Sequence, residues 1–226
     1  MIVEERMSVY LNSLDSGNGE FLDALEREAI AQEIPIIRPG MQSFLKTLLA
    51  YGKPQRILEV GTAVGFSAIL MAANSGPDCH ITTIEKYEKR IPLAKANFEA
   101  SGYKDRITFL EGDALEVMRE LQESYDMIFM DAAKGQYIHF LPEALRLLKV
   151  GGVLVSDNVL QDGDIIESHY AVERRNRTIY KRMRQYLYVL KHTDGLVTSV
   201  LPVGDGAAVT VKMQEELLCS GIGGRI

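Results

Sequence analysis

The sequence has few cysteines and no long hydrophobic run. Cys79 and Cys219 are its two cysteines, they lie far apart, and neither belongs to a Cys-x-x-Cys motif. A disulfide framework and a zinc site are therefore not supported. No stretch reaches the roughly 18 consecutive apolar residues of a membrane span, and the first residues show no signal-peptide pattern. We therefore expect a cytoplasmic protein with no membrane partner.

The chain also has no excess of positive charge. Lys and Arg number 25 against 31 Asp and Glu, so the formal net charge is −6. This balance excludes a general basic coat for nucleic acid but is compatible with a local basic patch. With 226 residues, 46% of them hydrophobic, the chain fits one domain with a sizeable core. We expect a single domain over 1–226, with N-terminal helices in 1–52, an α/β core in 56–213 and a tail in 214–226.

Short apolar segments alternate with helical patterns from Arg56 onward. The segments that we expect to be strands are β-branched and apolar on both faces: Arg56–Val60, His80–Glu85, Arg106–Leu110, Tyr125–Asp131 and Gly152–Ser156. Such strands are typical of parallel sheets covered on both sides, so the alternation predicts a doubly wound α/β sheet. The segments Leu196–Leu201 and Ala207–Met213, around a loop at Pro202–Gly206, predict an antiparallel pair at the sheet edge.

The residues before the first strand predict helices. Met1–Gln32 shows two amphipathic patterns broken at Asp15–Gly19, and Met41–Tyr51 shows a third that ends at Gly52. After Met213 the periodicity stops, so we expect no structural partner for the tail.

A glycine-containing turn joins the first strand to its helix, reading EVGTAVGFS over Glu59–Ser67. A dinucleotide fingerprint needs glycine at relative positions 1, 3 and 6, but Ala63 and Phe66 occupy positions 3 and 6 after Gly61. No Gly-Lys-Ser/Thr follows, so a P-loop is also absent. The turn therefore favours a ligand without a pyrophosphate, and a tight turn with no ligand is the simpler alternative.

Acidic residues at the next strand ends define what that ligand contains. Glu85 ends the second strand, where a carboxylate can bind two ribose hydroxyls, and Asp113 follows the third, near the expected adenine. Glu59 and Gly61 lie where a cationic amino-acid group could be held. A nucleoside joined to a charged amino acid describes S-adenosylmethionine (SAM).

Oxygen-bearing side chains follow the fourth and fifth strands. Asp131 ends the fourth, Asp157 and Asn158 end the fifth, and such neighbouring strand ends share one crevice. Carboxylate and amide oxygens suit Mg²⁺ or another hard divalent cation. Lys134 can reach the same crevice and accept a proton from a cation-polarised hydroxyl. The alternative is that each aspartate caps the helix that follows it.

These motifs together resemble the cation-dependent class I O-methyltransferases, a family that includes catechol and caffeoyl-CoA O-methyltransferases. The resemblance covers Ile34 to Met213 and is carried by ILEVGTAVGFSA, TIE, DAAKGQY and SDNVL. It implies a Rossmann-like class I methyltransferase fold with a mostly parallel seven-stranded sheet, SAM and Mg²⁺ as cofactors, and a homodimer.

The resemblance also implies roles for individual residues. Asp131, Asp157 and Asn158 match the family's metal ligands, and Lys134 matches its catalytic lysine. The positions that match its methyl-donor contacts are Ile36, Ile37, Gly61, Ser67, Glu85, Ala114 and Asp131.

An arginine-rich segment bears on the substrate. Residues 173–184 hold six basic side chains against one acidic: Arg174, Arg175, Arg177, Lys181, Arg182 and Arg184. On a helix, four of them would form a stripe able to bind RNA phosphates, opposite a packed face of Ile179, Met183, Tyr186 and Leu190. A solvated helix face with no partner is the alternative.

Within the family, the arginine-rich segment and the PVGDG loop are most similar in order to a bacterial branch. That branch methylates the 5-hydroxyl of 5-hydroxyuridine at the tRNA wobble position. We therefore expect tRNA as the partner. The second hypothesis is an enzyme of the same kind that methylates a small catechol-like or hydroxycinnamoyl acceptor. The third hypothesis is a non-catalytic SAM-binding or RNA-binding module.

Overall fold

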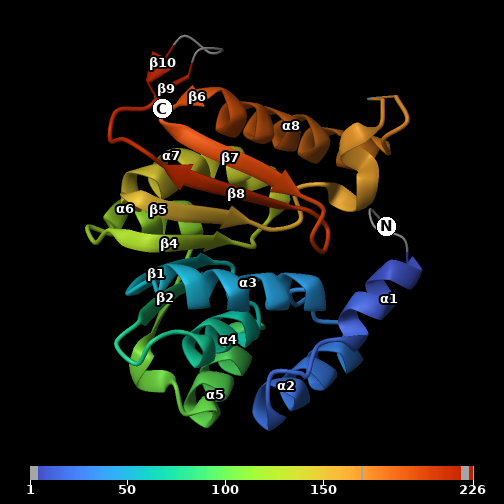
Figure 1. The fold of residues 1–226 in the computed structure, drawn as a ribbon, viewed down its shortest axis with the longest axis vertical. Helices are drawn as coiled ribbons and strands as arrows, with labels where there is room; N and C mark the ends of the chain where they lie inside the picture. The colour runs from blue at the N-terminus through green and yellow to red at the C-terminus, as the bar shows by residue number, and fades with distance from the viewer. Residues whose placement is uncertain (1–4, 169, 220–223, 226) are drawn as a thin grey trace.

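A seven-stranded sheet forms the centre of the computed structural model, which describes residues 5–168, 170–219 and 224–225 (Figure 1). Its order is β3-β2-β1-β4-β5-β8-β7. The strands are β1 (Arg56–Val60), β2 (His80–Glu85), β3 (Ile107–Glu111), β4 (Tyr125–Met130), β5 (Leu148–Ser156), β7 (Leu196–Leu201) and β8 (Ala207–Lys212). Strands β1 to β5 pair in parallel, while β8 runs antiparallel to both β5 and β7. The predicted doubly wound sheet with an antiparallel edge hairpin is confirmed.

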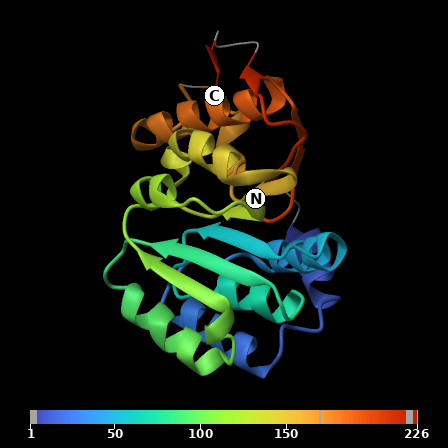
Figure 2. The ribbon, with the colours of Figure 1, turned by 90° about the vertical axis from the view of Figure 1, so that its left-hand side faces the viewer.

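Helices cover both faces of this sheet (Figures 1 and 2). They are α2 (Glu20–Ala31), α3 (Pro39–Gly52), α4 (Phe66–Asn74), α5 (Ile91–Ser101), α6 (Ala114–Glu120), α7 (Tyr137–Leu147) and α8 (Arg177–His192). Because side chains alternate along a strand, Ile57 packs with α2 to α5 while its neighbour Leu58 packs with α6 to α8. None of the helices in the described part of the chain is both long and apolar enough to cross a membrane.

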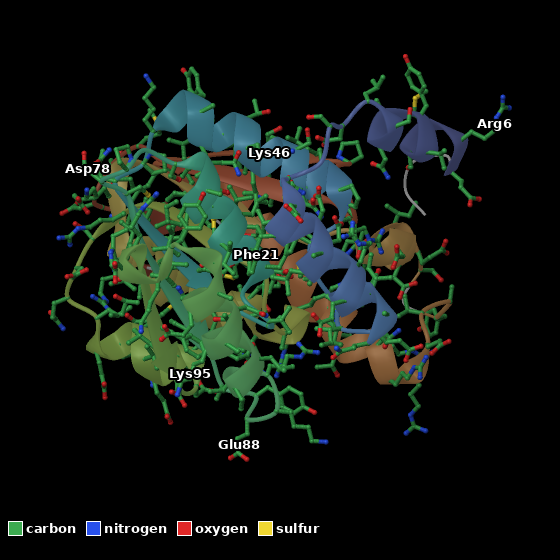
Figure 3. All side chains as sticks on the ribbon, turned by 90° about the horizontal axis from the view of Figure 1, so that it is seen from below. Arg6, Phe21, Lys46, Asp78, Glu88 and Lys95 are labelled. Atoms are coloured by element: carbon green, nitrogen blue, oxygen red, sulfur yellow. The ribbon has the colours of Figure 1, made fainter. Side chains whose placement is uncertain are left out.

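The N-terminal helices form as expected, but the first makes little contact with the rest. Helix α1 (Glu5–Ser13) buries none of its side chains, whereas α2 buries Leu22 and Leu25 against α4. Helix α1 lies at the edge of the molecule, and Figure 3 shows Arg6 pointing away from it. The break predicted at Asp15–Gly19 separates the two helices.

Several predicted strand bounds are wrong. Strand β4 ends at Met130 rather than Asp131, β5 begins at Leu148 rather than Gly152, and β8 ends at Lys212 rather than Met213. The third strand begins at Ile107 because Arg106 belongs to a short 3-10 helix, η1 (Lys104–Arg106). Its guanidinium donates hydrogen bonds to the carbonyls of Cys79 and Gly76, which hold it beside the sheet rather than in it. Strand β3 is also an edge strand that is only partly buried, so the expected apolar cover on both faces is absent there.

The segment after Met213 has a structural partner, contrary to expectation. Strand β9 (Leu218–Cys219) pairs with β6 (Thr193–Asp194) and with β10 (Gly224–Arg225) in a small second sheet. Leu217 is buried in the core beside α7 and α8. The reason is long-range: Gln214 lies against Gly195, and Leu217 packs in the same core cluster as residues of α7 and α8.

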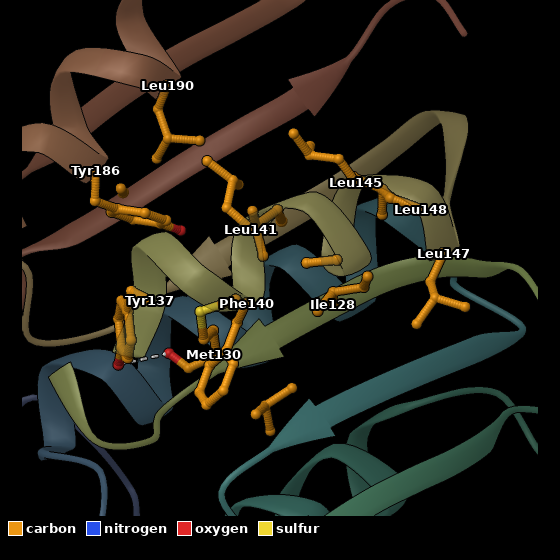
Figure 4. Close-up of a cluster of buried hydrophobic side chains, with 14 of the residues drawn as sticks. Ile128, Met130, Tyr137, Phe140, Leu141, Leu145, Leu147, Leu148, Tyr186 and Leu190 are labelled. Atoms are coloured by element: carbon orange, nitrogen blue, oxygen red, sulfur yellow. Dashed lines mark hydrogen bonds between the residues drawn. The ribbon is translucent and has the colours of Figure 1, made fainter. Parts of the chain in front are cut away.

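A buried tyrosine ties the ends of β4 and β5 together. The hydroxyl of Tyr137 is 3.1 Å from the carbonyl oxygens of both Met130 and Asp157 and donates a hydrogen bond (Figure 4). Its ring packs edge to face against Tyr186 of α8. This core fixes the two strand ends from which several predicted site residues project.

Candidate active site

The carboxyl ends of β1, β4 and β5 meet at one edge of the sheet. The amide of Asp131 donates to Val60 O at 2.9 Å, and the amide of Asp157 donates to Met130 O at 3.0 Å. A pocket of about 470 Å³ opens beside them. The predicted residues that line it are Gly61, Glu85, Asp113, Ala114, Asp131, Lys134 and Asn158. The strand order reverses between β1 and β4, the place where open α/β sheets bind ligands.

The fold itself requires a glycine at position 61, whether or not a ligand approaches the turn. A Cβ atom at this position would lie 2.1 Å from the carbonyl oxygen of Asp131, and its φ is +106°. Only glycine allows both this conformation and this approach. The turn after β1 is therefore pressed directly against the strand that carries Asp131.

Glu85 is held in a fixed orientation at the pocket wall. Its Oε2 accepts the amide of Ala63 at 2.9 Å, and its Oε1 accepts those of Lys86 and Tyr87 at 2.9 and 2.8 Å. Carboxylate oxygens have further acceptor capacity, so this arrangement leaves Glu85 able to bind hydroxyl groups in the pocket.

Asp113 begins helix α6 as well as lining the pocket. Its carboxylate accepts the amide of Leu115 at 3.0 Å and lies 3.1 Å from Lys86 Nζ. The hydrogen bond from Lys86, together with that from Leu115, lowers the pKa of Asp113. Ala114 follows as the first residue of the helix, so this turn offers the pocket a carboxylate and a small apolar side chain.

Glu59 lies fully buried behind the pocket. The Thr83 hydroxyl donates a hydrogen bond to its Oε2, whereas its Oε1 has no hydrogen-bond partner. Burial raises the pKa of Glu59 to about 7, against the opposing effect of the nearby Ser67 and Thr83 hydroxyls. An unpaired buried acceptor is costly, and a cationic or hydrogen-bonding group would relieve that cost.

Asp131, Asp157 and Asn158 come together as predicted from their strands. Asp157 is 1% exposed, and its Oδ1 accepts the amide of Asn158 at 2.7 Å. Burial raises the pKa of Asp131 to about 6, and burial together with the charge of Asp131 raises that of Asp157 to about 7. The 3-10 helices that follow, η2 (Lys134–Gln136) and η3 (Gln161–Ile166), have no side-chain cap, so the capping alternative is not supported.

The oxygen atoms of these three side chains fit a hard divalent cation. Two neighbouring carboxylates, one buried and one at the pocket wall, are stabilised by a positive charge between them, and an amide oxygen completes an all-oxygen set. In the described residues, no group of three or more His, Cys, Asp or Glu side chains is arranged to hold a metal. A cation here therefore depends on the amide of Asn158, whose backbone takes a left-handed φ of 57°.

Lys134 reaches the same place from η2. Its Nζ lies 3.1 Å from Oδ2 of Asp205, a residue of the β7–β8 loop that is 1% exposed. The sequence identified this loop as a turn and as part of the resemblance to the bacterial branch, without a role for Asp205. Asp205 is therefore a site residue that sequence reasoning missed, because nothing local in PVGDG indicates a contact 71 residues away.

Four residues predicted to contact the methyl donor do not line the pocket through their side chains. Ile37 is buried in the core and its carbonyl accepts a hydrogen bond from Gln42, while Pro35 of the same segment faces the pocket. Ile36, Glu59 and Ser67 are likewise absent from the lining. Lining residues that the sequence did not indicate include Ala63, Tyr87, Arg90, Gln136 and Phe140.

The basic segment is only partly available for a partner. Arg177, Arg182 and Arg184 donate hydrogen bonds to the carbonyls of Val172, Gly135 and Ile165, at 3.1, 3.1 and 2.9 Å. These three arginines brace the loops around the pocket, so the predicted stripe is shorter than expected. Arg174, Arg175 (paired with Glu173 at 2.7 Å) and Lys181 are exposed and make no such carbonyl contact, and Arg184 is exposed although it bonds to Ile165.

The packed face of this helix is close to the expected one. Met183, Tyr186 and Leu190 are buried as predicted. Ile179 is only partly buried, and Tyr180 is buried in its place.

The family model described as O-methyltransferase matches residues 12–213. A catechol O-methyltransferase from Mycobacterium tuberculosis (strain ATCC 25618 / H37Rv) is 32% identical over 163 residues, which cover 71% of this chain and 74% of that protein. A caffeoyl-CoA O-methyltransferase from Eucalyptus gunnii is 29% identical and covers 76% of this chain and 71% of its own length.

Solved structures agree with these sequence matches. One from Staphylococcus aureus, provisionally described as a caffeoyl-CoA O-methyltransferase, has a TM-score of 0.86 and 32% identity, covering 92% of this chain and 100% of that one. An O-methyltransferase from Bacillus cereus in complex with SAH has a TM-score of 0.81 at 24% identity, covering 92% and 97%. The second likeness shows the fold.

Proposed function

The chain belongs to the O-methyltransferase family, and we propose that it transfers the methyl group of SAM to a hydroxyl oxygen with the help of a divalent cation. The observation that carries this proposal is the meeting of the buried Asp157 with Asp131, Asn158 and Lys134, the last three of which line a pocket together with Glu85. A neutral binding module has no need for so much buried negative charge.

The pocket residues divide between the parts of the donor. Glu85 would bind the ribose hydroxyls, and the Asp113–Ala114 turn would face the adenine. The unpaired Oε1 of Glu59 supports a role behind Gly61 for the amino-acid end, where a donor ammonium is attracted to a carboxylate. SAM supplies an electrophilic methyl group when bound.

The metal and the lysine would prepare the acceptor. Asp131, Asp157 and Asn158 would hold the cation, which when bound supplies Lewis-acid polarisation of acceptor oxygens. Lys134 would accept the hydroxyl proton at its Nζ.

For the acceptor we propose a 5-hydroxyuridine at the tRNA wobble position. Its ring hydroxyl lies next to a carbonyl oxygen, so the two could chelate a cation as a catechol does. The position of α8 supports this acceptor: Arg182 bonds to Gly135, the residue after Lys134, so the exposed Arg174 and Lys181 belong to the segment beside the site. Cations there could bind phosphates that flank the reacting nucleotide.

A small catechol-like or hydroxycinnamoyl acceptor is the second candidate. Two observations favour it: the relatives named above, and a second cavity of about 880 Å³ between α1, α3 and the β7–β8 loop. Its lining combines apolar side chains, among them Leu11, Phe44 and Val203, with polar ones such as Arg38 and Asp162, a mixture that suits an aromatic acceptor with polar substituents.

The deciding experiment measures methyl transfer from labelled SAM to tRNA that carries 5-hydroxyuridine, beside catechol and caffeoyl-CoA, with Mg²⁺ and with EDTA. Label in tRNA that disappears with EDTA is the expected result. Label only in a small phenol would replace the acceptor and keep the metal chemistry. Transfer that EDTA leaves unchanged would contradict the metal.

A further inference from the structure

Asp205 is a buried charge with no part in the chemistry described so far. It belongs to the β7–β8 loop, is 1% exposed, and lies far in sequence from every other residue of the site. Burying a carboxylate is costly unless it is well bonded, so its contacts indicate what it does.

The two oxygens of Asp205 bind two different loops. Oδ2 accepts a hydrogen bond from Lys134 Nζ at 3.1 Å, and Oδ1 accepts one from the backbone amide of Asp162. Lys134 follows β4 and Asp162 follows β5, so this single carboxylate links the two segments that carry the metal ligands.

The backbone around Asp205 reinforces this link. The amides of Leu160 and Val159 donate to the carbonyls of Asp205 and Gly206, both at 3.0 Å. A Cβ atom on Gly206 would lie 2.3 Å from Leu160 Cγ, so the loop packs closely against the residues that follow Asn158. Asp162 holds a left-handed φ of 50°, in the turn whose amide reaches the carboxylate.

We propose that Asp205 is a positioning residue that holds Lys134 Nζ where it meets the acceptor hydroxyl and fixes the segment 159–162 relative to it. This inference rests on the proposed function, because the place of Lys134 matters only if that lysine accepts the hydroxyl proton. It would do so as the neutral amine, after losing its ammonium proton to solvent, and the neutral amine still donates an N–H to Asp205 while its lone pair faces the acceptor. A buried ion pair that serves stability alone is the competing explanation.

The test uses Asp205→Asn, which keeps the size of the side chain and an oxygen for the Asp162 amide but removes the charge that faces Lys134. The matched control is Asp126→Asn. Asp126 also joins a lysine (Lys149, 2.7 Å) to backbone amides, those of Gln55 and Arg56, at the opposite end of β4. Both variants lose one carboxylate–lysine pair, but only the first touches Lys134.

The first readout does not depend on activity. Acetic anhydride labels each lysine at a rate that rises when its amine is freed from an ion pair, and peptide mass spectrometry of the metal-free, donor-free protein reports the rates. Asp205→Asn should raise the labelling rate of Lys134 severalfold and leave Lys149 unchanged. Asp126→Asn should do the reverse.

The second readout is the kinetics of methyl transfer. Asp205→Asn should lower kcat by about 10- to 100-fold, as is usual for a group that orients a reacting one, with the KM for SAM nearly unchanged. Asp205→Glu, which restores the charge at a longer reach, should recover part of the loss. Asp126→Asn should keep the wild-type kcat.

Unchanged Lys134 labelling in Asp205→Asn would overturn the proposal, and so would equal losses of kcat in the two aspartate variants. If Asp205→Asn does not fold, Asp205→Glu carries both readouts, because the displaced charge must still alter Lys134 labelling. If the wild-type protein methylates no hydroxyl acceptor, the proposed function fails, and the labelling ratio alone decides whether Asp205 holds Lys134.

Discussion

The close approach of Gly61 to Asp131 predicts an unequal cost for two glycine substitutions. Gly61→Ala places a Cβ 2.1 Å from a carbonyl oxygen, whereas Gly102, with a similar φ of +78°, has nothing within 4 Å of that position. Gly102→Ala should cost about 1 kcal/mol for its left-handed backbone alone. Gly61→Ala should cost clearly more in urea unfolding, since two strands must separate. Equal costs would mean that the turn relaxes freely.

Lys134 is the residue most directly tied to the chemistry. Lys134→Ala should lower kcat by about 10²- to 10⁴-fold, the usual contribution of a general base. SAH affinity, measured by calorimetry, should stay close to that of the wild-type protein, because the proposed contacts to the methyl donor are Glu85 and Asp113 rather than Lys134. A loss of only a few-fold in kcat would show that another group accepts the proton.

Glu59 predicts a pH dependence of stability. Burial raises its pKa from an ordinary 4.5 to about 7, so the folded protein keeps a proton that the unfolded chain releases between these values. Its contribution to stability is therefore present below about pH 4.5 and is lost as the pH rises toward 7.

The variant Glu59→Gln isolates this effect. Over that pH range the wild-type free energy of unfolding should fall relative to that of the variant by about 3 kcal/mol. Urea unfolding of the metal-free and donor-free proteins at several pH values measures the difference. A difference that stays constant with pH would contradict the buried, raised pKa.

The cations of the basic segment 174–184 differ in whether they contact loop carbonyls. Because Arg177, Arg182 and Arg184 donate hydrogen bonds to loop carbonyls, the exposed cations without such a contact, Arg174 and Lys181, are the ones proposed to bind a nucleic acid. The double variant Arg174→Glu, Lys181→Glu should weaken tRNA binding and make it less sensitive to salt, and should leave catechol methylation and Tm nearly unchanged. Filter binding over a salt series measures this. Unchanged tRNA affinity would contradict the proposed RNA contact and favour a solvated surface with no partner.

Strand and helix positions were largely predictable, since they depend on local patterns. Arg56–Val60 and His80–Glu85 are strands at the predicted bounds, because a buried parallel strand leaves an apolar run between polar ends. Arg106 was misplaced because its guanidinium finds carbonyls on a neighbouring loop, which no pattern around residue 106 records.

The site was predictable where strand ends determine it and not where loops do. Asp131, Asp157 and Asn158 could be brought together from topology alone, since parallel strands end at one edge. Asp205 and the carbonyl contacts of the arginines could not, because loop-to-loop packing over 71 residues leaves no periodic trace. The pairing of Leu218–Cys219 with Thr193–Asp194 was missed for the same reason.

The whole molecule leaves an apolar helix surface uncovered. On α1, Val9 and Tyr10 are 63% and 59% exposed, and Leu14 just after it is 64% exposed. Exposed apolar patches of this kind mark association sites, so we propose a homodimer that buries α1. Sedimentation should show a dimer that Tyr10→Ser with Leu14→Ser shifts toward monomer. Tyr51→Ser, at an exposed aromatic residue on α3, should not. A wild-type monomer would contradict the proposal.

The late position of the β7–β8 hairpin has a consequence for synthesis on the ribosome. The residues that line the proposed donor pocket, the last of which is Asn158, are synthesised before Asp205 and β8. Until β8 emerges, β5 is paired with β4 on one side only, and its other edge has free backbone groups that can pair with another chain. A nascent chain that has not yet extended to β8 therefore contains the residues of the proposed donor pocket, a β5 edge without its partner strand and a Lys134 without its Asp205 contact, and the β7–β8 hairpin supplies both missing partners together.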